Sequence, residues 1–496
     1  MQRNTLGQPA QETTRPSPIR RGIAPVLAFS AMSVAVMQTL LVPVIKDLPT
    51  LLDTTPGNAA WVMTATLLAA AIATPIMGRL GDLYGKRRTL LISLAVMAAG
   101  SLIGAFTDNL MIMIVGRALQ GFGLGAVPPA LGLMRDVLPA HKVRPAMALL
   151  SSAVGVGGGL ALPAAALIAQ NADWHALFLC SALMAALALL LIYLVVPESP
   201  LRAMGRFDAI GAAGLSLGLV SLLLPLTKGS TWGWTSPTTL GLFAAAVVIL
   251  LLWGLFELRH TAPLVDLRTT ARRPVLLANL ATISVGFVWY VVTLALPQLL
   301  QIPASTGYGP GQSMVMAGVL VAPLGLTMMA TTPLYSRLAA RYGPKATMVL
   351  GMLIIAIGYT AGLFLMSAAW QAVVITVVLG LGSGLAFSST PALITGAVDP
   401  SETSAANGLN NLMRSIGSSS SSAVVGMVLA NATTRTGSVE APTLDGFRTA
   451  FLIAILAALA GLALAAFLPS QRSTRQTQPD NVEAVPAAAE PRPIQR

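Results

Sequence analysis

The feature that most constrains this chain is a succession of long apolar stretches that recur along its whole length. A helix of about 20 residues rises about 30 Å, which matches the hydrocarbon thickness of a bilayer. Only 10% of the 496 residues are charged and 55% are hydrophobic, whereas soluble domains carry about 25% charged residues. A soluble helical protein needs polar helix faces that these stretches lack. The sequence therefore predicts an all-α integral membrane protein.

Fourteen stretches are expected to cross the membrane, as a group of six, a pair, and a second group of six. Five regions follow: a disordered arm at 1–22, a six-helix bundle at 23–196, two inserted helices with a basic linker at 197–274, a second six-helix bundle at 275–469, and a disordered tail at 470–496. The expected spans are 23–45, 59–77, 89–106, 110–134, 144–169, 174–196, 208–227, 237–256, 275–300, 314–334, 347–366, 369–394, 405–430 and 447–469.

Positive charge is distributed unevenly between the intervals that separate these spans. Alternate intervals hold 24 of the 30 Lys and Arg residues, the other intervals hold only four, and two lie within or at the edge of spans. Because cytoplasmic loops of membrane proteins are enriched in Lys and Arg, both termini are predicted to be cytoplasmic. This topology also explains the net charge of +12, so we expect no nucleic-acid partner. The expected location is a bacterial plasma (inner) membrane.

The most informative interval is residues 78–88, which we call the charged segment. It reads Gly-Arg-Leu-Gly-Asp-Leu-Tyr-Gly-Lys-Arg-Arg and is expected to be a loop between the second and third spans. A related sequence recurs 258 residues later, where Tyr84 and Gly85 align with Tyr342 and Gly343. Asp82 instead aligns with Ala340, so the second copy lacks the acid. Duplicated halves with a site at their interface are typical of transporters.

The charged segment resembles a signature of the major facilitator superfamily, and the fourteen spans resemble its drug:proton antiporter branch. The resemblance covers residues 23–469 and implies that the segment braces the two halves, its acid meeting basic groups and a helix N-terminus. A role in topology alone is the alternative. The residues assigned to this conformational switch are Gly78, Asp82, Gly85, Lys86, Arg87 and Arg88.

Two further stretches match patterns of the same family. Arg117 and Gln120 lie in an R-x-x-Q-G-x-G run of the fourth span, which implies a role in coupling or substrate binding. An arginine that snorkels to the interface is the alternative. Gly155, Gly158 and Pro163 of the fifth span resemble the antiporter motif loosely, and a simple helix-packing role is equally open.

The first span departs from the family pattern, because Gln38 stands where this branch carries an acid. No Asp or Glu lies deep inside any expected span, although a proton-coupled carrier needs a titrating group in its cavity. The remaining candidates lie at span ends, and the sequence places none of them in a cavity: Asp53, Asp82, Asp108, Asp136, Asp173, Asp208 and Glu257.

Polar and aromatic residues within other spans are candidates for lining a substrate cavity, because a polar face in lipid must point into protein or water. Packing is the equally weighted alternative for each. They are Asn279, Trp289, Tyr290, Asn411 and Arg414.

Other function classes lack their sequence requirements. The chain has no HExxH, no nucleophile elbow with partners and no Walker loop, so neither an enzyme nor an ATP-driven pump is expected. No catalytic residue, metal or cofactor is predicted, and a proton gradient is the expected energy source. We expect a monomer that exports amphiphilic drugs or secondary metabolites by alternating access, with uptake of a small metabolite or a sensor without transport as alternatives.

Overall fold

The computed structural model describes residues 22–469 except 43, 46, 437 and 438. The predicted arm at 1–21 and tail at 470–496 lie outside the described residues. Within the described residues, eleven helices are long and apolar enough to span a membrane, and two shorter apolar helical stretches occupy 23–39 and 314–330. The prediction of an all-α membrane protein is therefore confirmed.

The helices of the first half are α1 (Ile23–Thr39), α2 (Leu48–Leu51), α3 (Pro56–Ala59), α4 (Trp61–Tyr84), α5 (Lys86–Ala105), α6 (Leu110–Phe122), η2 (Gly123–Ala126), α7 (Val127–Val137), α8 (Ala140–Asn171) and α9 (His175–Val195). The inserted pair is α10 (Ala209–Trp232) and α11 (Pro237–Arg259), followed by α12 (Leu267–Thr270).

The second half consists of α13 (Arg273–Gln301), η3 (Ala304–Thr306), α14 (Met314–Val321), α15 (Pro323–Ala330), α16 (Thr332–Gly362), α17 (Ala369–Thr395), η4 (Pro400–Glu402), α18 (Thr403–Asn431) and α19 (Leu444–Ala466). Strands β1 (Thr433–Thr436) and β2 (Val439–Pro442) form an antiparallel hairpin between α18 and α19, with Thr433 opposite Pro442.

The expectation that residues 78–88 form a loop is wrong. Helix α4 continues to Tyr84 and α5 begins at Lys86, so Gly85 alone separates them. Its φ of 121° is accessible to glycine but strained for other residues. Packing of this stretch against α18 extends α4 beyond its apolar part despite two glycines of low helix propensity, and Gly85 ends the helix. Likewise, the predicted linker at 257–274 begins inside α11, which reaches Arg259.

Three expected spans end early or are interrupted. α1 stops at Thr39 rather than at residue 45. The expected spans 110–134 and 314–334 are each divided into two helical stretches. A proline in the first turn of α7 and another at the start of α15 lack the N–H group that would continue the preceding helix. α18 is 29 residues long, but it contains a run of five serines at 418–422 and is not one of the eleven strongly apolar helices.

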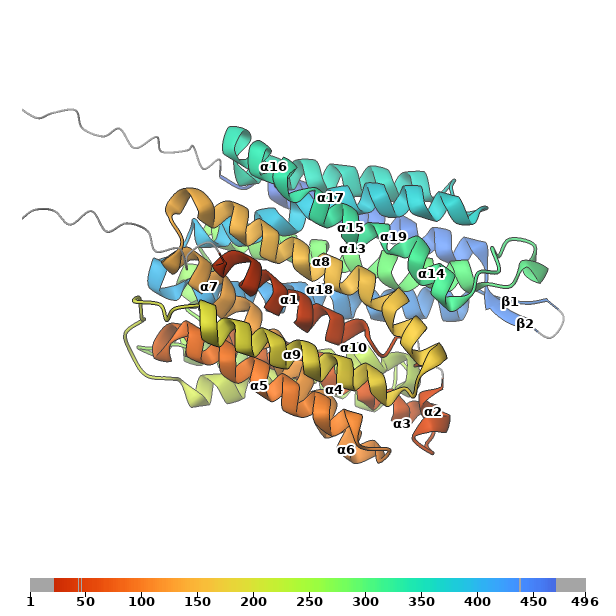
Figure 1. The fold of residues 1–496 in the computed structure, drawn as a ribbon, viewed down its shortest axis with the longest axis horizontal. Helices are drawn as coiled ribbons and strands as arrows, with labels where there is room; N and C mark the ends of the chain where they lie inside the picture. The colour runs from red at the N-terminus through yellow and green to blue at the C-terminus, as the bar shows by residue number, and fades with distance from the viewer. Residues whose placement is uncertain (1–21, 43, 46, 437–438, 470–496) are drawn as a thin grey trace, which may run out of the picture.

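Each half has its own apolar core. One cluster of buried side chains draws all its members from residues 275–468, and two others draw theirs from residues 23–196. The halves meet where α4 and α7 pack against α18 and where α8 packs against α14, α15 and α17. Figure 1 shows α8 running lengthwise beside α14 and α15 of the second half.

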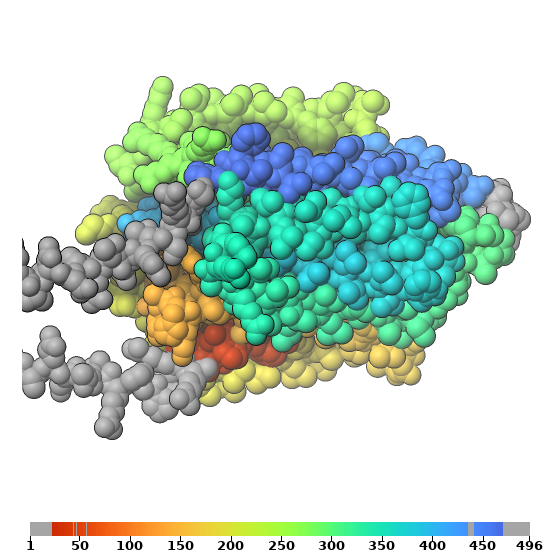
Figure 2. Space-filling model, turned by 90° about the horizontal axis from the view of Figure 1, so that it is seen from above, coloured from red at the N-terminus to blue at the C-terminus, as the bar shows by residue number. Residues whose placement is uncertain are grey.

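The inserted pair lies on one flank of the junction between the halves. α10 contacts both α4 and α18, and a separate apolar cluster joins Ala71, Leu219 and Leu409 from these three helices. Most side chains of α11 face outward. Figure 2 shows the pair, in yellow-green, as a ridge along one side of the molecule.

Both ends of the described chain lie beside a copy of the duplicated segment. Gly22 lies beside Val195, since a Cβ on this glycine would be 3.4 Å from the valine side chain, and Ala466 of α19 lines a hollow with Tyr342 and Lys345 of the second copy. The two ends of the chain are therefore on the same side of the molecule as the two copies.

Candidate functional site

Asp82 joins the two halves. It lies in the last turn of α4, is completely buried, and accepts hydrogen bonds from the backbone N–H groups of Ser404 (3.2 Å) and Ala405 (2.7 Å). These amides belong to the first turn of α18, whose own N-cap residue Glu402 supplies no side-chain cap. Asp82 therefore caps a helix of the other half, where unpaired amides and the helix dipole stabilise a negative charge.

Gly78 allows this approach. A Cβ at this position would lie 2.6 Å from the carbonyl oxygen of Ser404. Gly408 of α18 is matched to α4 in the same way, since its Cβ would lie 2.6 Å from the carbonyl oxygen of Thr74. The two helices are thus in backbone contact, and small residues are required on both sides.

Lys86 is buried between two carboxylates. Its ammonium lies 2.6 Å from Asp136 and 3.4 Å from Asp82. The hydroxyl of Ser199 also donates to Asp136. Removing one member of such a buried group would leave the others uncompensated, which is strongly destabilising.

Cations from the first half also reach the start of α18. Arg135 donates to the hydroxyl of Thr403 (2.6 Å) and lies 3.4 Å from the carbonyl oxygens of Val398 and Asp399. Arg79 lies 3.8 Å from Glu402. Hydrogen bonds from the hydroxyl and amide of Ser401 lower the pKa of Asp399, so this turn keeps its negative charge.

Arg87 and Arg88 act here through their backbones. Their N–H groups donate to the carboxylate of Glu198, at 2.9 and 3.2 Å, so Glu198 caps α5. The guanidinium of Arg87 donates to the carbonyl of Tyr193. Sequence reasoning missed Glu198 and Ser199, and it named Asp136 as an acid at a span end without predicting its pairing with Lys86. An acid directly after the sixth span, on the side of the charged segment, was the available signal.

Arg117 lies inside the first half. It is 1% exposed and donates to Gln120 at 2.7 Å, and Gln120 in turn donates to Ser101 at 2.8 Å. Among the described residues, its other neighbours are neutral: the carbonyl of Val62 and the sulfurs of Met37 and Met63. The sulfur of Met37, rather than the amide of the half-buried Gln38, faces the guanidinium. The arginine is therefore held by neutral acceptors.

The fifth-span glycines pack the halves together. A side chain at Gly155 would collide with Met328, and Gly318 of α14 fits closely against Pro163. Gly158 faces Trp289 across the junction with more room, since a Cβ at this position would lie 3.9 Å from the Trp289 ring. The geometry supports the packing interpretation of this motif.

The second half contains a polar and aromatic group near Gly158. The guanidinium of Arg414 stacks 5.0 Å from the ring of Phe387, which meets Trp289 edge to face at 5.4 Å. Arg414 also donates to Asn411. These residues come from α13, α17 and α18, so the structure brings Trp289, Asn411 and Arg414 together; Phe387 was not predicted.

Asn279 and Tyr290 are placed differently. Asn279 is buried and accepts from Asn410, which also donates to Thr282. This pairing ties α13 to α18, as polar residues do between membrane helices. Tyr290 is half-buried beside Trp289 in α13.

The described residues include no group of three or more His, Cys, Asp or Glu side chains that could hold a metal ion. The site therefore contains a closed contact between the halves, the buried Arg117 and the half-buried Arg414, and both arginines have neutral hydrogen-bond acceptors.

Comparison with known proteins decides the family. The model of the Major Facilitator Superfamily matches residues 27–419 and, in a second match, 278–495. The chain belongs to the major facilitator superfamily. It is therefore a membrane transporter and not an enzyme.

Named relatives of the chain include drug-export proteins. It is 29% identical over 417 residues to the tetracenomycin C resistance and export protein of Streptomyces glaucescens, covering 82% of this chain and 75% of that protein. It is 26% identical over 413 residues to multidrug resistance protein 3 of Bacillus subtilis, covering 82% and 78%. These relatives confirm the predicted resemblance to drug transporters of this superfamily.

The fold is also shared with a solved structure. The crystal structure of the human organic anion transporter MFSD10 (TETRAN) superposes with a TM-score of 0.63 at 16% identity, covering 90% of this chain and 99% of that one.

Proposed function

We propose that this transporter exports amphiphilic drugs or secondary metabolites across a bacterial inner membrane, in exchange for protons. The observation that carries the proposal is the contact of Asp82 with α18, which joins the halves at one end of the molecule. In alternating access this contact must break before a substrate cavity between the halves can open to that side. Relatives named as drug-resistance and export proteins support the direction of transport.

The membrane arrangement proposed for this function has fourteen spans. The eleven apolar helices, the two shorter apolar stretches and the more polar α18 supply them. Six would form each half, and α10 and α11 would be the inserted pair. Cations of the charged segment and its second copy lie on the side of both described chain ends, which supports cytoplasmic termini. A monomer provides both halves of the cavity.

The proposed substrates are neutral or anionic. Arg117 in the first half and Arg414 in the second are fixed cations whose hydrogen-bond acceptors among the described residues are neutral. A buried cation favours an anionic or electron-rich ligand and disfavours another cation. Trp289 and Phe387 beside Arg414 provide the apolar surface that an amphiphile requires.

Flux measurements in proteoliposomes test the proposal. A pH gradient should drive transport of neutral or anionic amphiphiles, and a protonophore should abolish accumulation. Arg117→Ala should reduce anion flux by about tenfold, since a charged hydrogen bond contributes about 1.5–3 kcal/mol. Strong export of ethidium-like cations that is unchanged in Arg117→Ala would contradict the proposed substrate class. Flux that is indifferent to the gradient would contradict proton exchange.

A further inference from the structure

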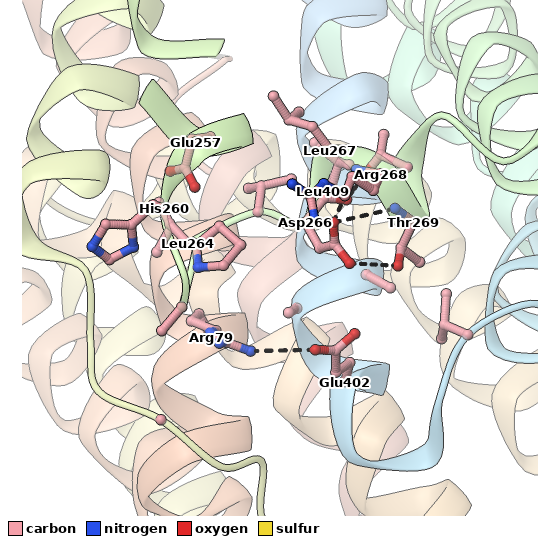
Figure 3. Close-up of a pocket in the computed structure, with 18 of the residues that line it drawn as sticks. Arg79, Glu257, His260, Leu264, Asp266, Leu267, Arg268, Thr269, Glu402 and Leu409 are labelled. Atoms are coloured by element: carbon pink, nitrogen blue, oxygen red, sulfur yellow. Dashed lines mark hydrogen bonds and ion pairs between the residues drawn. The ribbon is translucent and has the colours of Figure 1, made fainter. Parts of the chain in front are cut away.

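A cavity of about 460 Å³ lies where the inserted pair meets the contact between the halves. Its walls come from α4, α11, the segment 260–270, α13 and α18 (Figure 3). Glu257 of α11 faces it from one side, and Arg79 and Glu402 close its base. The sequence placed none of the acids at span ends in a cavity, and the structure shows that Glu257 lines this one.

Glu257 is buried in the wall of this cavity. It is 2% exposed, and neither of its carboxyl oxygens makes a hydrogen bond of good geometry to a described residue; its polar neighbours are the backbone N–H groups of Leu264 and Val265. Asp208, the N-cap of α10, is 6% exposed; one of its oxygens accepts from the N–H of Gly211 at 2.8 Å and the other has no hydrogen bond. A Cβ on Gly211 would touch both carboxyl groups, so Asp208 and Glu257 face each other over this glycine.

The charged groups around the pair come from several elements. His260 Nδ1 is 3.6 Å from Asp208, beyond hydrogen-bond distance but within range of an ion pair when the imidazole is protonated. Arg79 of α4 is directed to Glu402 of α18, and its Nε, also buried in the cavity wall, has no partner. Asp266 accepts from Thr269, and Arg268 donates to the carbonyl of Leu258. Two adjacent buried carboxylates repel each other when both are ionised, which favours the binding of a proton at the site.

We propose that Asp208 and Glu257 form a proton-binding carboxyl pair, which supplies the titrating group that is missing at Gln38. This inference rests on the proposed proton-coupled transport. The pair shares its cavity with Arg79 and Glu402, and Glu402 immediately precedes the turn of α18 that Asp82 caps. A change from one shared proton to none alters the field at the Arg79–Glu402 ion pair and thereby the contact between the halves.

The test compares the full-length protein with Glu257→Gln and Asp208→Asn, which keep the shape of each side chain. Three quantities are measured: accumulation driven by a pH gradient, exchange of labelled substrate without a gradient, and proton release when substrate is added to the detergent-solubilised protein. Glu257→Gln should lose proton release and lower driven accumulation by about tenfold, because an amide cannot release a proton. Exchange without a gradient should persist, because the fold is intact.

Asp445→Asn is the matched control, since Asp445 is an exposed acid at the start of α19 that pairs with the exposed Arg448. It should retain all three activities, and melting temperatures should show that every variant folds. Normal proton release by both Glu257→Gln and Asp208→Asn would overturn the pair while leaving proton-coupled transport standing. A wild-type protein without driven accumulation or proton release would overturn both proposals. Driven transport by a sodium or potassium gradient that requires Glu257 would show a metal cation in place of the proton.

Discussion

The charged segment and its second copy share a backbone design but differ in chemistry. Gly85 and Gly343 both have positive φ values, 121° and 82°, and each ends one helical stretch and starts the next. In the first copy Asp82 is buried and caps α18. In the second copy the aligned Ala340 is exposed. The duplication has thus preserved the turn and kept the charged contact between the halves in one copy only.

The helices that each copy approaches differ accordingly. α18 receives its cap from Asp82. α8 begins after Pro139, which provides no side-chain cap. Near the second copy, the hydroxyl of Thr332 donates to Ser152 of α8 at 2.8 Å, a neutral contact. A charged buried contact is costly to break and to re-form with water, whereas a neutral hydroxyl pair is not. The first copy therefore has the properties of a conformational switch, whereas the neutral contact at the second copy can break and re-form at little cost.

The largest effect should follow the loss of the acid. Asp82→Asn should reduce flux by about tenfold to a hundredfold, because it removes a buried carboxylate bonded to two amides and lying 3.4 Å from Lys86. Ala340→Asn is its counterpart in the second copy and should leave flux within about twofold, as surface substitutions usually do. Equal losses in the two variants would remove the functional distinction between the copies.

The next largest effect on flux should come from disturbing the close approach of α4 to α18. Gly78→Ala places a Cβ 2.6 Å from the carbonyl oxygen of Ser404 and should cost about 1–3 kcal/mol of packing between the halves. Flux should fall by about tenfold. Ser336→Ala, at the aligned position, should have no measurable effect on transport. A fully active Gly78→Ala protein would show that α4 and α18 can separate without loss.

Gly85 and Gly343 provide a test of the backbone turn that the two copies share. Gly85→Ala and Gly343→Ala should each lower stability by about 1 kcal/mol, because both residues have positive φ. Gly85→Ala should lower the melting temperature more, since its Cβ would also lie 2.9 Å from Glu198. A larger shift for Gly343→Ala would contradict this order.

The smallest effect should come from the cap of α5. Glu198→Gln should lower the melting temperature by an amount equivalent to about 1 kcal/mol, because an amide oxygen replaces a carboxylate at the N–H groups of Arg87 and Arg88. Transport should persist, since Glu198 lies within the first half. Loss of transport at unchanged stability would show that Glu198 belongs to the switch.

The sequence predicted the apolar helices because hydropathy and length determine them locally. The prediction of a loop at residues 78–88 was wrong, because the end of an apolar stretch marks the membrane boundary and not the end of the helix. The contact of Asp82 with Ser404 and Ala405 spans more than 300 positions, and only the resemblance to the family pointed toward it. Glu257 was visible as an acid at a span end, but its burial beside Asp208 depends on packing that no local pattern encodes.

α18 has a consequence for biogenesis. In the fourteen-span arrangement proposed above, this helix crosses the bilayer with Asn407, Asn410, Asn411, Arg414 and five consecutive serines. A segment so poor in apolar side chains partitions weakly from the translocon into lipid. The Asn410 amide finds Asn279 and Thr282 on α13, which has been synthesised earlier. α18 therefore inserts with the help of helices that are already in the membrane. Substitution of Asn279 should impair membrane assembly of the protein before it affects transport.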